Sequence, residues 1–239
     1  MPALKVRRGY PLGRIGTGRG KAAHNPMDTP NEPEQKDTPM LLNVEESQLV
    51  LVDYQERLMP FIHEGDMVVR NAVRLGKIAR MLQVPVWGTE ENPSRLGPNA
   101  PEVRELCDKT LSKMYFNACE DGLSDALRPP ARPVSGNARS LPRHLQKNID
   151  KPAERNTIVI AGCEAHVCLM QTALGLLEDE FDVWVVTDAC SSRTERNRDA
   201  GFDRLATAGA ELVTTEMVAF EWMRTAEHPQ FRDVLALIK

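Results

Sequence analysis

The sequence predicts an α/β fold, a doubly wound, six-stranded, mostly parallel sheet with helices on both faces. Short runs of apolar, largely β-branched residues recur along the chain without polar alternation, which is typical of strands buried on both faces of a parallel sheet. These runs alternate about six times with segments of helical periodicity, as a doubly wound layer requires. The chain of 239 residues, 41% hydrophobic and 27% charged, is long enough for one such domain.

The first half of the chain supplies three expected strands. The first buried strand is expected at 48–53 and the second at 84–89, and an amphipathic helix over 66–82 connects them. A short segment at 111–116 stands where a third strand belongs, and residues 120–127 read as a short helix. The residues that follow the second strand, Glu90 to Pro93, are expected in a loop at the same edge of the sheet.

The central stretch TIVIAGCEAHVCLMQTALGLL predicts a strand, a tight turn and a helix in direct succession. Thr157 to Ile160 is an apolar, β-branched run that ends near Gly162. The period then changes to the three-and-four spacing of a helix face, carried by Val167, Met170, Leu174 and Leu177. This places Cys168 in the first turn of the helix.

The last third of the chain continues the alternation. A fifth strand is expected at 181–188, and the capping box at Ser192 predicts a helix that runs to about Ala208. A sixth strand follows at 211–214 and a helix at 215–223. Pro229, at a first-turn position, then opens a last helix that ends near Ile238.

Two segments lack any strand or helix period and are expected to flank or interrupt the folded domain of residues 41–239. Residues 1–40 form a basic, then Pro-rich tail that we expect to be disordered. Its acid-free, Arg-bearing start is compatible with a mitochondrial presequence and with a solvated tail. Residues 128–151 carry four prolines and six Lys or Arg against one acid, which favours a basic, Pro-rich insertion. Without interleaved aromatics it reads as a solvated loop rather than an RNA contact.

Charge and cysteine content limit the classes of partner and the cellular compartments to expect for this protein. The net charge of −4 gives no reason to expect nucleic acid or an acidic membrane as a partner of the folded part. No apolar run approaches the ~18 residues of a membrane span. Five cysteines without a CxxC pair argue against a disulfide scaffold or a zinc ribbon and for a reducing compartment, cytoplasmic or mitochondrial rather than secreted. Three of them are expected to be structural thiols: Cys107, Cys163 and Cys190.

Candidate site residues follow the expected strands. Asp53 ends the first strand, and ligands of open parallel sheets bind at such carboxyl ends, although a turn cap is an equal alternative by position. Right-handed crossovers place the ends of strands one and four side by side, so Asp53 and Cys168 are expected to be neighbours. A thiol at a helix start has its thiolate favoured, whereas a buried, inert thiol is the alternative. Lys113, taken alone, reads as a surface lysine.

Three short patterns in this order resemble the isochorismatase-like cysteine hydrolases, the superfamily that includes the nicotinamidases. They are LVDYQE with Asp53 as the acid, LSKMYF with Lys113, and GCEAHVC with Cys168 as the nucleophile. The later stretch VVTDACSSR and the ending HPQF…ALIK resemble the subgroup of isochorismatase domain-containing proteins, whose substrates are generally not established. The resemblance covers about residues 44–239 without the insertion.

The resemblance implies covalent acyl transfer. Asp53 would take the thiol proton of Cys168 and later return a proton to the leaving amine. Lys113 would keep both groups charged, because a nearby cation lowers the pKa of an acid and of a thiol. The backbone N–H groups of Cys168 and Glu164 would form the oxyanion hole, with a cis peptide bond between Cys163 and Glu164. Cys163 is the one rival nucleophile, but it lies five residues too early for the family pattern.

The segment after the second strand departs from the nicotinamidases. Those enzymes bind a metal there through an Asp-x-His pair and a further His, whereas WGTEENPSRLGPNAP contains no His. The resemblance therefore implies no metal and no cofactor, and it counts against nicotinamide as the substrate. Isochorismatases proper lack the cysteine, so an amide, carbamoyl or ester bond fits better than their vinyl ether. Pocket residues are expected near the same strand ends: Gln55, Glu90, Glu91, Phe116, Cys119 and Glu164.

Our first hypothesis is a metal-independent cysteine hydrolase of a small amide, carbamoyl or ester substrate, acting through a Cys168 acyl-enzyme. Two alternatives remain, a non-catalytic or redox-sensing interaction protein that retains the fold, and a nucleic-acid-acting protein that uses the basic tail and insertion. The complete set of Asp53, Lys113 and Cys168 favours the hydrolase, because a scaffold would not require all three. Since family members are usually oligomers, the resemblance also implies a homo-oligomer.

Overall fold

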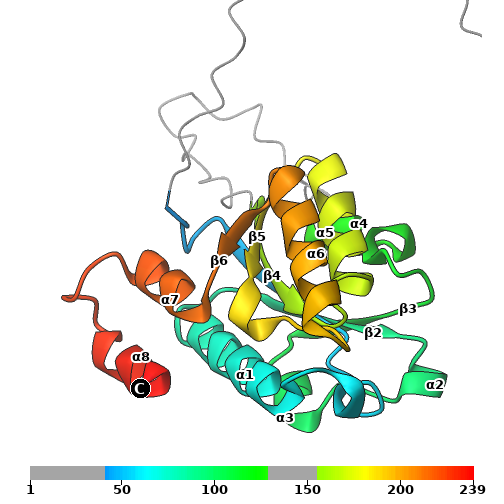
Figure 1. The fold of residues 1–239 in the computed structure, drawn as a ribbon. Helices are drawn as coiled ribbons and strands as arrows, with labels where there is room; N and C mark the ends of the chain where they lie inside the picture. The colour runs from blue at the N-terminus through cyan, green and yellow to red at the C-terminus, as the bar shows by residue number, and fades with distance from the viewer. Residues whose placement is uncertain (1–40, 129–154) are drawn as a thin grey trace, which may run out of the picture. The chain divides into compact units, whose positions relative to one another are not determined.

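The computed structural model describes residues 41–128 and 155–239, which form an α/β domain with one six-stranded sheet. All strand pairs are parallel, in the order β3-β2-β1-β4-β5-β6 (Figure 1). The strands are β1 Ser47–Val52, β2 Val86–Glu91, β3 Lys109–Lys113, β4 Thr157–Gly162, β5 Asp182–Val186 and β6 Glu211–Val213. The predicted doubly wound fold is thus confirmed, with a sheet that is wholly rather than mostly parallel.

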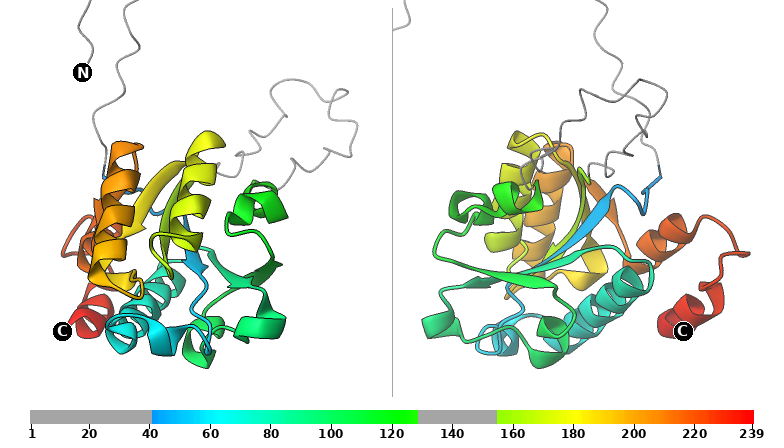
Figure 2. Two further views of the ribbon diagram at one scale, coloured as in Figure 1. Left: turned by 45° about the vertical axis from the view of Figure 1, so that its right-hand side comes forward. Right: turned by 180° about the vertical axis from the view of Figure 1, so that it is seen from behind.

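Helices cover both faces of the sheet. In Figures 1 and 2, α5 and α6 lie on one face, and α1, α7 and α8 lie on the other. The helices are α1 Gly65–Met81, α2 Pro93–Leu96, α3 Pro101–Arg104, α4 Leu123–Leu127, α5 Cys168–Glu178, α6 Glu195–Thr207, α7 Thr215–Met223 and α8 Phe231–Ile238. Among the described residues, none of these helices combines the length and the apolar composition needed to cross a membrane.

The expected elements are present, but several boundaries differ. β2 continues through Glu91, where a loop was expected from Glu90 onward. β3 lies at 109–113 rather than 111–116, because it pairs in register with β2 only as far as Glu91 opposite Lys113. The α6 helix begins at Glu195, not at Ser192, and its N-cap is Thr194, whose hydroxyl accepts from the N–H of Asn197.

The α5 helix forms where it was expected, but its most buried face is not the predicted one. The side chains with the lowest exposure lie one position away from the predicted stripe, at Leu169, Ala173 and Leu176. Val167, Leu174 and Leu177 of that stripe are half-buried. Because α5 is apolar on nearly every side, its sequence periodicity does not identify the face that meets the sheet.

The core is built on the two central strands. Every residue of β1 and of β4 is buried, as the unbroken apolar runs predict. The two strands pair along their full length, from Ser47 opposite Thr157 to Val52 opposite Gly162. Their carboxyl ends therefore lie side by side, which brings the residues after Val52 next to the turn after Gly162.

At Gly162, β4 leaves no room for a side chain against β1. A Cβ atom there would lie 2.3 Å from the carbonyl oxygen of Val52, a backbone atom that cannot move aside. We expect Gly162→Ala to lower the free energy of unfolding by about 3 kcal/mol or more in urea titrations. Gly122→Ala is the control, because Gly122 has a φ of 91° but no atom within 4 Å of the added methyl, so about 1 kcal/mol is expected. Equal losses in the two variants would contradict this explanation.

The predicted tail of residues 1–40 lies outside the described residues, and so does the predicted insertion, apart from Arg128. Arg128 ends the α4 segment, where its guanidinium donates to the carbonyl oxygens of Asp179 and Glu180 and lies over the Phe181 ring.

Candidate active site

Four polar side chains meet at the carboxyl ends of the central strands. Asp53 follows β1, Glu91 ends β2, Lys113 ends β3, and Cys168 begins α5. Each is buried, with 0% of Asp53, 8% of Glu91, 1% of Lys113 and 7% of Cys168 exposed. One carboxylate oxygen of each acid and the sulfur of Cys168 all lie within 4.8 Å of one another. The structure thus brings together the three residues that the sequence patterns singled out, and it adds Glu91 to them.

Asp53 is held in place by its backbone and by one of its two carboxylate oxygens. It leaves β1 in the left-handed region, with a φ of 53°, which Asp tolerates better than most residues. Its Oδ1 accepts a hydrogen bond of 2.7 Å from the hydroxyl of Thr89. Its Oδ2 lies 2.8 Å from the Lys113 ammonium but without hydrogen-bond alignment, so it has no hydrogen-bond partner among the described residues. Oδ2 therefore has the Lys113 ammonium as its one close charged neighbour among the described residues.

Lys113 is buried because two carboxylates meet it. Its Nζ lies 2.8 Å from Asp53 Oδ2 and 2.8 Å from Glu91 Oε2, and it also donates to the carbonyl oxygen of Tyr115 at 3.3 Å. The contact with Glu91 is a direct cross-strand pair of β2 and β3. Burial lowers the pKa of Lys113, but the combined effect of Asp53, Cys168 and Glu91 raises it by more. The net shift of the pKa is upward, so the ammonium stays charged.

Cys168 is the first residue of α5, and the turn before it is anchored on both sides. The peptide bond between Cys163 and Glu164 is cis, as the resemblance implies. The carbonyl oxygen of Glu164 accepts from the N–H groups of Val167 and Leu169. Within the described residues, the N–H groups of Glu164 and Cys168 donate to no other backbone group. Both are thus available for the oxyanion that the resemblance assigns to them.

The thiol of Cys168 does not have the lowered pKa that its position at a helix start predicts. Burial raises the pKa of Cys168, the Asp53 carboxylate raises it further, and Lys113 only partly opposes them. Because two carboxylates face one ammonium, the surroundings of the sulfur disfavour a second negative charge. These surroundings therefore favour the thiol form of Cys168 over a preformed thiolate in the resting site.

Two of the expected pocket residues, Gln55 after β1 and Glu90 on β2, have structural contacts instead. The Gln55 side chain is fully buried, and its hydrogen-bonding groups are used by the backbone. Its amide donates to the carbonyl oxygens of Glu91 and Gly97 and accepts from the Glu91 N–H. Gln55 thereby fixes the strand that carries Glu91. Glu90 lies on the opposite side of β2, because successive residues of a strand alternate, and its carboxylate accepts from the N–H of Asn99.

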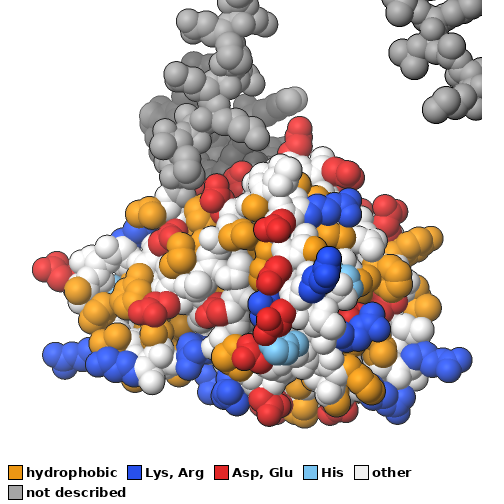
Figure 3. Space-filling model, viewed as in Figure 1, with side chains coloured by type: hydrophobic (Ala, Val, Ile, Leu, Met, Phe, Trp, Pro, Cys, Tyr) orange, Lys and Arg blue, Asp and Glu red, His pale blue; other side chains and the backbone are white. Residues whose placement is uncertain are grey.

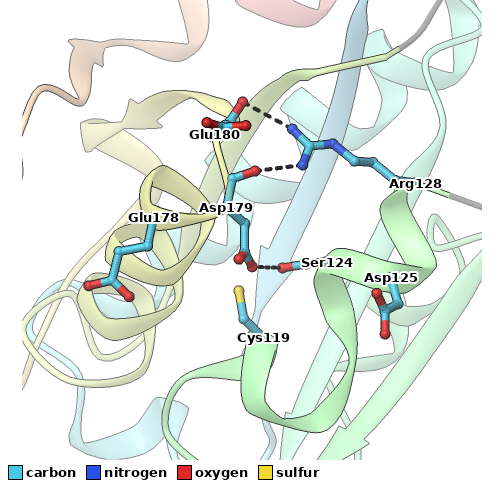
Figure 4. A pocket seen from close by; sticks show the side chains of 7 residues that line it. All are labelled: Cys119, Ser124, Asp125, Arg128, Glu178, Asp179 and Glu180. Atoms are coloured by element: carbon cyan, nitrogen blue, oxygen red, sulfur yellow. Dashed lines mark hydrogen bonds between the residues drawn. The ribbon is translucent and has the colours of Figure 1, made fainter.

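Phe116 and Cys119 follow β3 but do not join the four-residue cluster. Phe116 is 51% exposed, and its carbonyl oxygen accepts from Thr172 on α5. Cys119 lines a separate cavity of about 420 Å³ together with acidic residues of the α5 end (Figure 4). Its sulfur lies near the carbonyl oxygen of Thr172, and burial raises its pKa to about 11.

Glu164 forms an ion pair with Arg193 that the sequence did not predict. Its carboxylate binds the Nε of Arg193 at 2.7 Å, and the Arg193 side chain is 61% exposed. The neighbouring Ser192 contacts the ring of His166 at 2.9 Å, so the loop after β5 is tied to the turn that precedes Cys168.

Thr89 was also missed, although it is a polar residue in a buried strand, opposite the last residue of β1. That isolated polarity is the one sequence signal that points to it.

The three expected structural cysteines are away from the cluster or inaccessible. Cys163 is fully buried and has a pKa raised mainly by burial. The sulfur of Cys190 accepts from the N–H of Gly162, and burial raises its pKa to about 12. Cys107 is half-buried near the carbonyl oxygen of Val103, and burial raises its pKa to about 12 as well. These environments suit structural thiols.

By spacing alone, Asp53, Glu91 and Cys168 are close enough to share a metal ion. The position between the two carboxylates, however, is taken by the ammonium of Lys113, 2.8 Å from each. A cation bound by both acids would have to displace a buried lysine. The residues present therefore fit a lysine-centred ion cluster better than a metal centre.

Comparison with known proteins gives the family. The family model of the isochorismatase domain matches residues 140–217. Isochorismatase domain-containing protein 2A of Mus musculus is 35% identical over 195 residues, which cover 82% of this chain and 84% of the mouse protein. The chain belongs to the isochorismatase-domain family. The resemblance stated from the three motifs is thus confirmed, and the family supports a hydrolase as the general class of this protein.

Solved structures of similar fold cover most of this isochorismatase-domain chain. The MAR1 ribonuclease from Caenorhabditis elegans has a TM-score of 0.70 at 29% identity and covers 83% of this chain and 92% of its own. YcaC from Pseudomonas aeruginosa, solved with hexane-2,5-diol and covalent acrylamide, has a TM-score of 0.69 at 25% identity (84% and 92% covered). The YcaC gene product from Escherichia coli, an octameric hydrolase of unknown specificity, has a TM-score of 0.66 at 25% identity (84% and 97%).

Proposed function

We propose that this protein is a metal-independent cysteine hydrolase that cleaves a small amide, carbamoyl or ester substrate through a Cys168 acyl-enzyme. The observation that carries the proposal is the buried Asp53 carboxylate, which has one oxygen within 4.8 Å of the Cys168 sulfur and its Oδ2 2.8 Å from the Lys113 ammonium. A nucleophile, a base and a group that orients the base are the parts that covalent hydrolysis needs. The covalent acrylamide of the Pseudomonas aeruginosa relative is compatible with a reactive nucleophile in this fold.

The resting thiol sets the order of the proton transfers. As Cys168 Sγ attacks the carbonyl carbon, its proton passes to Asp53 Oδ2, and the N–H groups of Glu164 and Cys168 receive the oxyanion. The bond to the leaving amine or alcohol then breaks, and Asp53 returns the proton to that group. Water attacks the thioester with Asp53 again as the base, which releases the acid and restores the thiol. Lys113 stays protonated throughout and compensates the charge that moves between sulfur and carboxylate.

The proposal extends to the assembly and the compartment. A homo-oligomer is supported by the octameric Escherichia coli relative. A monomer in a sedimentation experiment at micromolar concentration would contradict this proposal. The five free cysteines, all with a pKa raised by burial and none in a disulfide, support a cytosolic or mitochondrial rather than a secreted protein.

The test compares the alkylation of Cys168 by iodoacetamide in the wild type and in Asp53→Asn. Two effects of the substitution have opposite signs. Loss of the neighbouring negative charge lowers the pKa of Cys168 and would speed alkylation, whereas loss of the base would slow it. If Asp53 takes the proton, we expect the rate at pH 7 to fall at least about tenfold. The rate is measured by peptide mass spectrometry between pH 6 and 9.

The outcome that overturns the hydrolase is equal or faster alkylation of Cys168 in Asp53→Asn. Such a result would mean that Asp53 acts on the thiol only as a charge, as in a non-catalytic protein that retains the fold. The other cysteines are internal references, because Cys119 lies in a different cavity and should react alike in both proteins.

A nucleic-acid-acting protein is the second candidate, and the one observation that favours it is the name of the Caenorhabditis elegans relative, a MAR1 ribonuclease. On the face shown in Figure 3, basic side chains are interspersed with acidic ones over the described residues. We expect the full chain to bind single-stranded RNA no more tightly than a nonspecific acidic protein at 150 mM salt. Micromolar binding that weakens steeply with salt and is lost on deletion of residues 129–151 would favour the second candidate instead.

A further inference from the structure

The Lys113 ammonium is shared by two carboxylates, and only one of them is needed as the base. Asp53 Oδ2 lies 2.8 Å from Nζ, and Glu91 Oε2 receives a hydrogen bond of 2.8 Å from it. Glu91 is held rigidly, since Gln55 clamps its backbone N–H and carbonyl, and its side chain is 11% exposed. A second buried acid is costly to keep, so the cluster carries a charge that proton transfer alone does not require.

The charges that face the Cys168 sulfur add up to a negative value. Among residues 41–128 and 155–239, the charged side chains that act on the thiol are two acids, Asp53 and Glu91, and one base, Lys113. At the rim, Glu164 and Arg193 bind each other and cancel. Asp121, in the short 3-10 helix Ala118–Asp121 after β3, has its Oδ2 occupied by the N–H groups of Met114 and Tyr115. A substrate carbonyl that reaches Cys168 therefore enters a site with an excess of one negative charge.

We propose that Glu91 is a specificity-determining residue, whose carboxylate makes the surroundings of Cys168 admit uncharged carbonyl compounds and exclude carboxylates. This inference rests on the proposed function, because it names the substrate class of the same site. An anionic group a few ångströms from Glu91 is repelled in a buried environment where water screens poorly. Neutral amides, carbamoyl compounds and esters carry no such penalty. Tyr115, whose carbonyl oxygen accepts from the Lys113 ammonium, is 60% exposed and offers apolar contact to such a substrate.

The experiment compares two alkylating reagents of similar size, neutral iodoacetamide and anionic iodoacetate, on the full-length protein. The readout is the ratio of the iodoacetate rate to the iodoacetamide rate at Cys168, divided by the same ratio for free cysteine. We expect a ratio well below one in the wild type and an increase of about tenfold in Glu91→Gln, from the loss of one charge within 4.8 Å. Glu91→Asp, which keeps the charge, should restore the low ratio.

Glu90→Gln is a matched control, because Glu90 and Glu91 are adjacent on β2 and equally buried, at 8% each, but Glu90 faces the other side. Its ratio should stay within twofold of the wild type. An equal ratio in wild type and Glu91→Gln overturns the inference. A wild-type ratio near one overturns it as well, and that measurement does not depend on whether any variant folds. The two proposals fail separately, because the hydrolase depends on the Asp53→Asn rate and this inference on the reagent ratio.

Discussion

Replacement of Cys168 by Ala is expected to abolish turnover of any amide, carbamoyl or ester that the wild-type protein hydrolyses. Without the sulfur there is no acyl-enzyme, and water would have to attack the substrate directly, so we expect kcat to fall roughly a thousandfold or more. The measurement is ammonia or alcohol release over a panel of small neutral substrates, with wild type and variant at equal concentration. The fold should persist, because the change removes one sulfur atom at a helix start that is 7% exposed.

Cys119→Ala is the matched control for this loss. Cys119 is also a partly buried thiol, but it lines the separate cavity of Figure 4 and is absent from the cluster around Lys113. Its replacement should leave kcat within about twofold of the wild type. If Cys168→Ala keeps its activity, the nucleophile lies elsewhere and the acyl-enzyme mechanism is wrong.

Replacement of Lys113 by Met is expected to have the largest effect on stability. Met fills a similar volume but leaves Asp53 and Glu91, both of which are within 2.8 Å of the present ammonium, as buried anions without a counterion. Breaking a buried ion cluster in this way costs about 3–5 kcal/mol of the free energy of unfolding. Catalysis should be lost as well, because no cation would then compensate the charge that moves between thiol and base.

The loss in Lys113→Met should depend on pH in a definite direction. To fold, the variant must bind a proton on one of the two carboxylates, so the native state holds more protons than the unfolded state. Its free energy of unfolding therefore falls as pH rises. Urea titrations at pH 5.5 and 8 should show the greater destabilisation at pH 8.

Lys109→Met separates this effect from the loss of any lysine on β3. Lys109 lies on the same strand but is exposed, with its ammonium 5.0 Å from the centre of the Trp87 ring. We expect a cost below about 1 kcal/mol with little dependence on pH. Similar losses and similar pH profiles for the two variants would contradict the buried ion cluster.

The doubly wound layer and the neighbourhood of Asp53 and Cys168 were predictable because they depend on local patterns. The apolar runs of β1 and β4 indicate strands buried on both faces, and the rule of right-handed crossovers then places their ends together. The three motifs identified the acid, the lysine and the thiol. Each of these inferences uses residues close in sequence, or a topology that few alternatives satisfy.

The features that escaped prediction are set by contacts between distant residues. Lys113 alone reads as exposed, and its burial becomes understandable only with Glu91 on the neighbouring strand and Asp53 two strands away. Glu90 and Glu91 look equivalent in the sequence, but the register of β2 sends them to opposite sides. Helix position predicts a lowered pKa for Cys168, whereas burial and a carboxylate from β1 raise it.

The position of β3 has a consequence for how the site can be lost. β3 is an outer strand of the sheet that pairs with β2 alone, and four of its five residues are exposed or half-buried. Outer strands with few buried contacts open more readily than the centre of a fold. Fraying of this margin would withdraw the ammonium from two carboxylates that remain fixed on β1 and β2. Backbone amides of β3 should therefore exchange hydrogen for deuterium ahead of those of β1. The protein would then lose activity under conditions in which the rest of the domain is still folded.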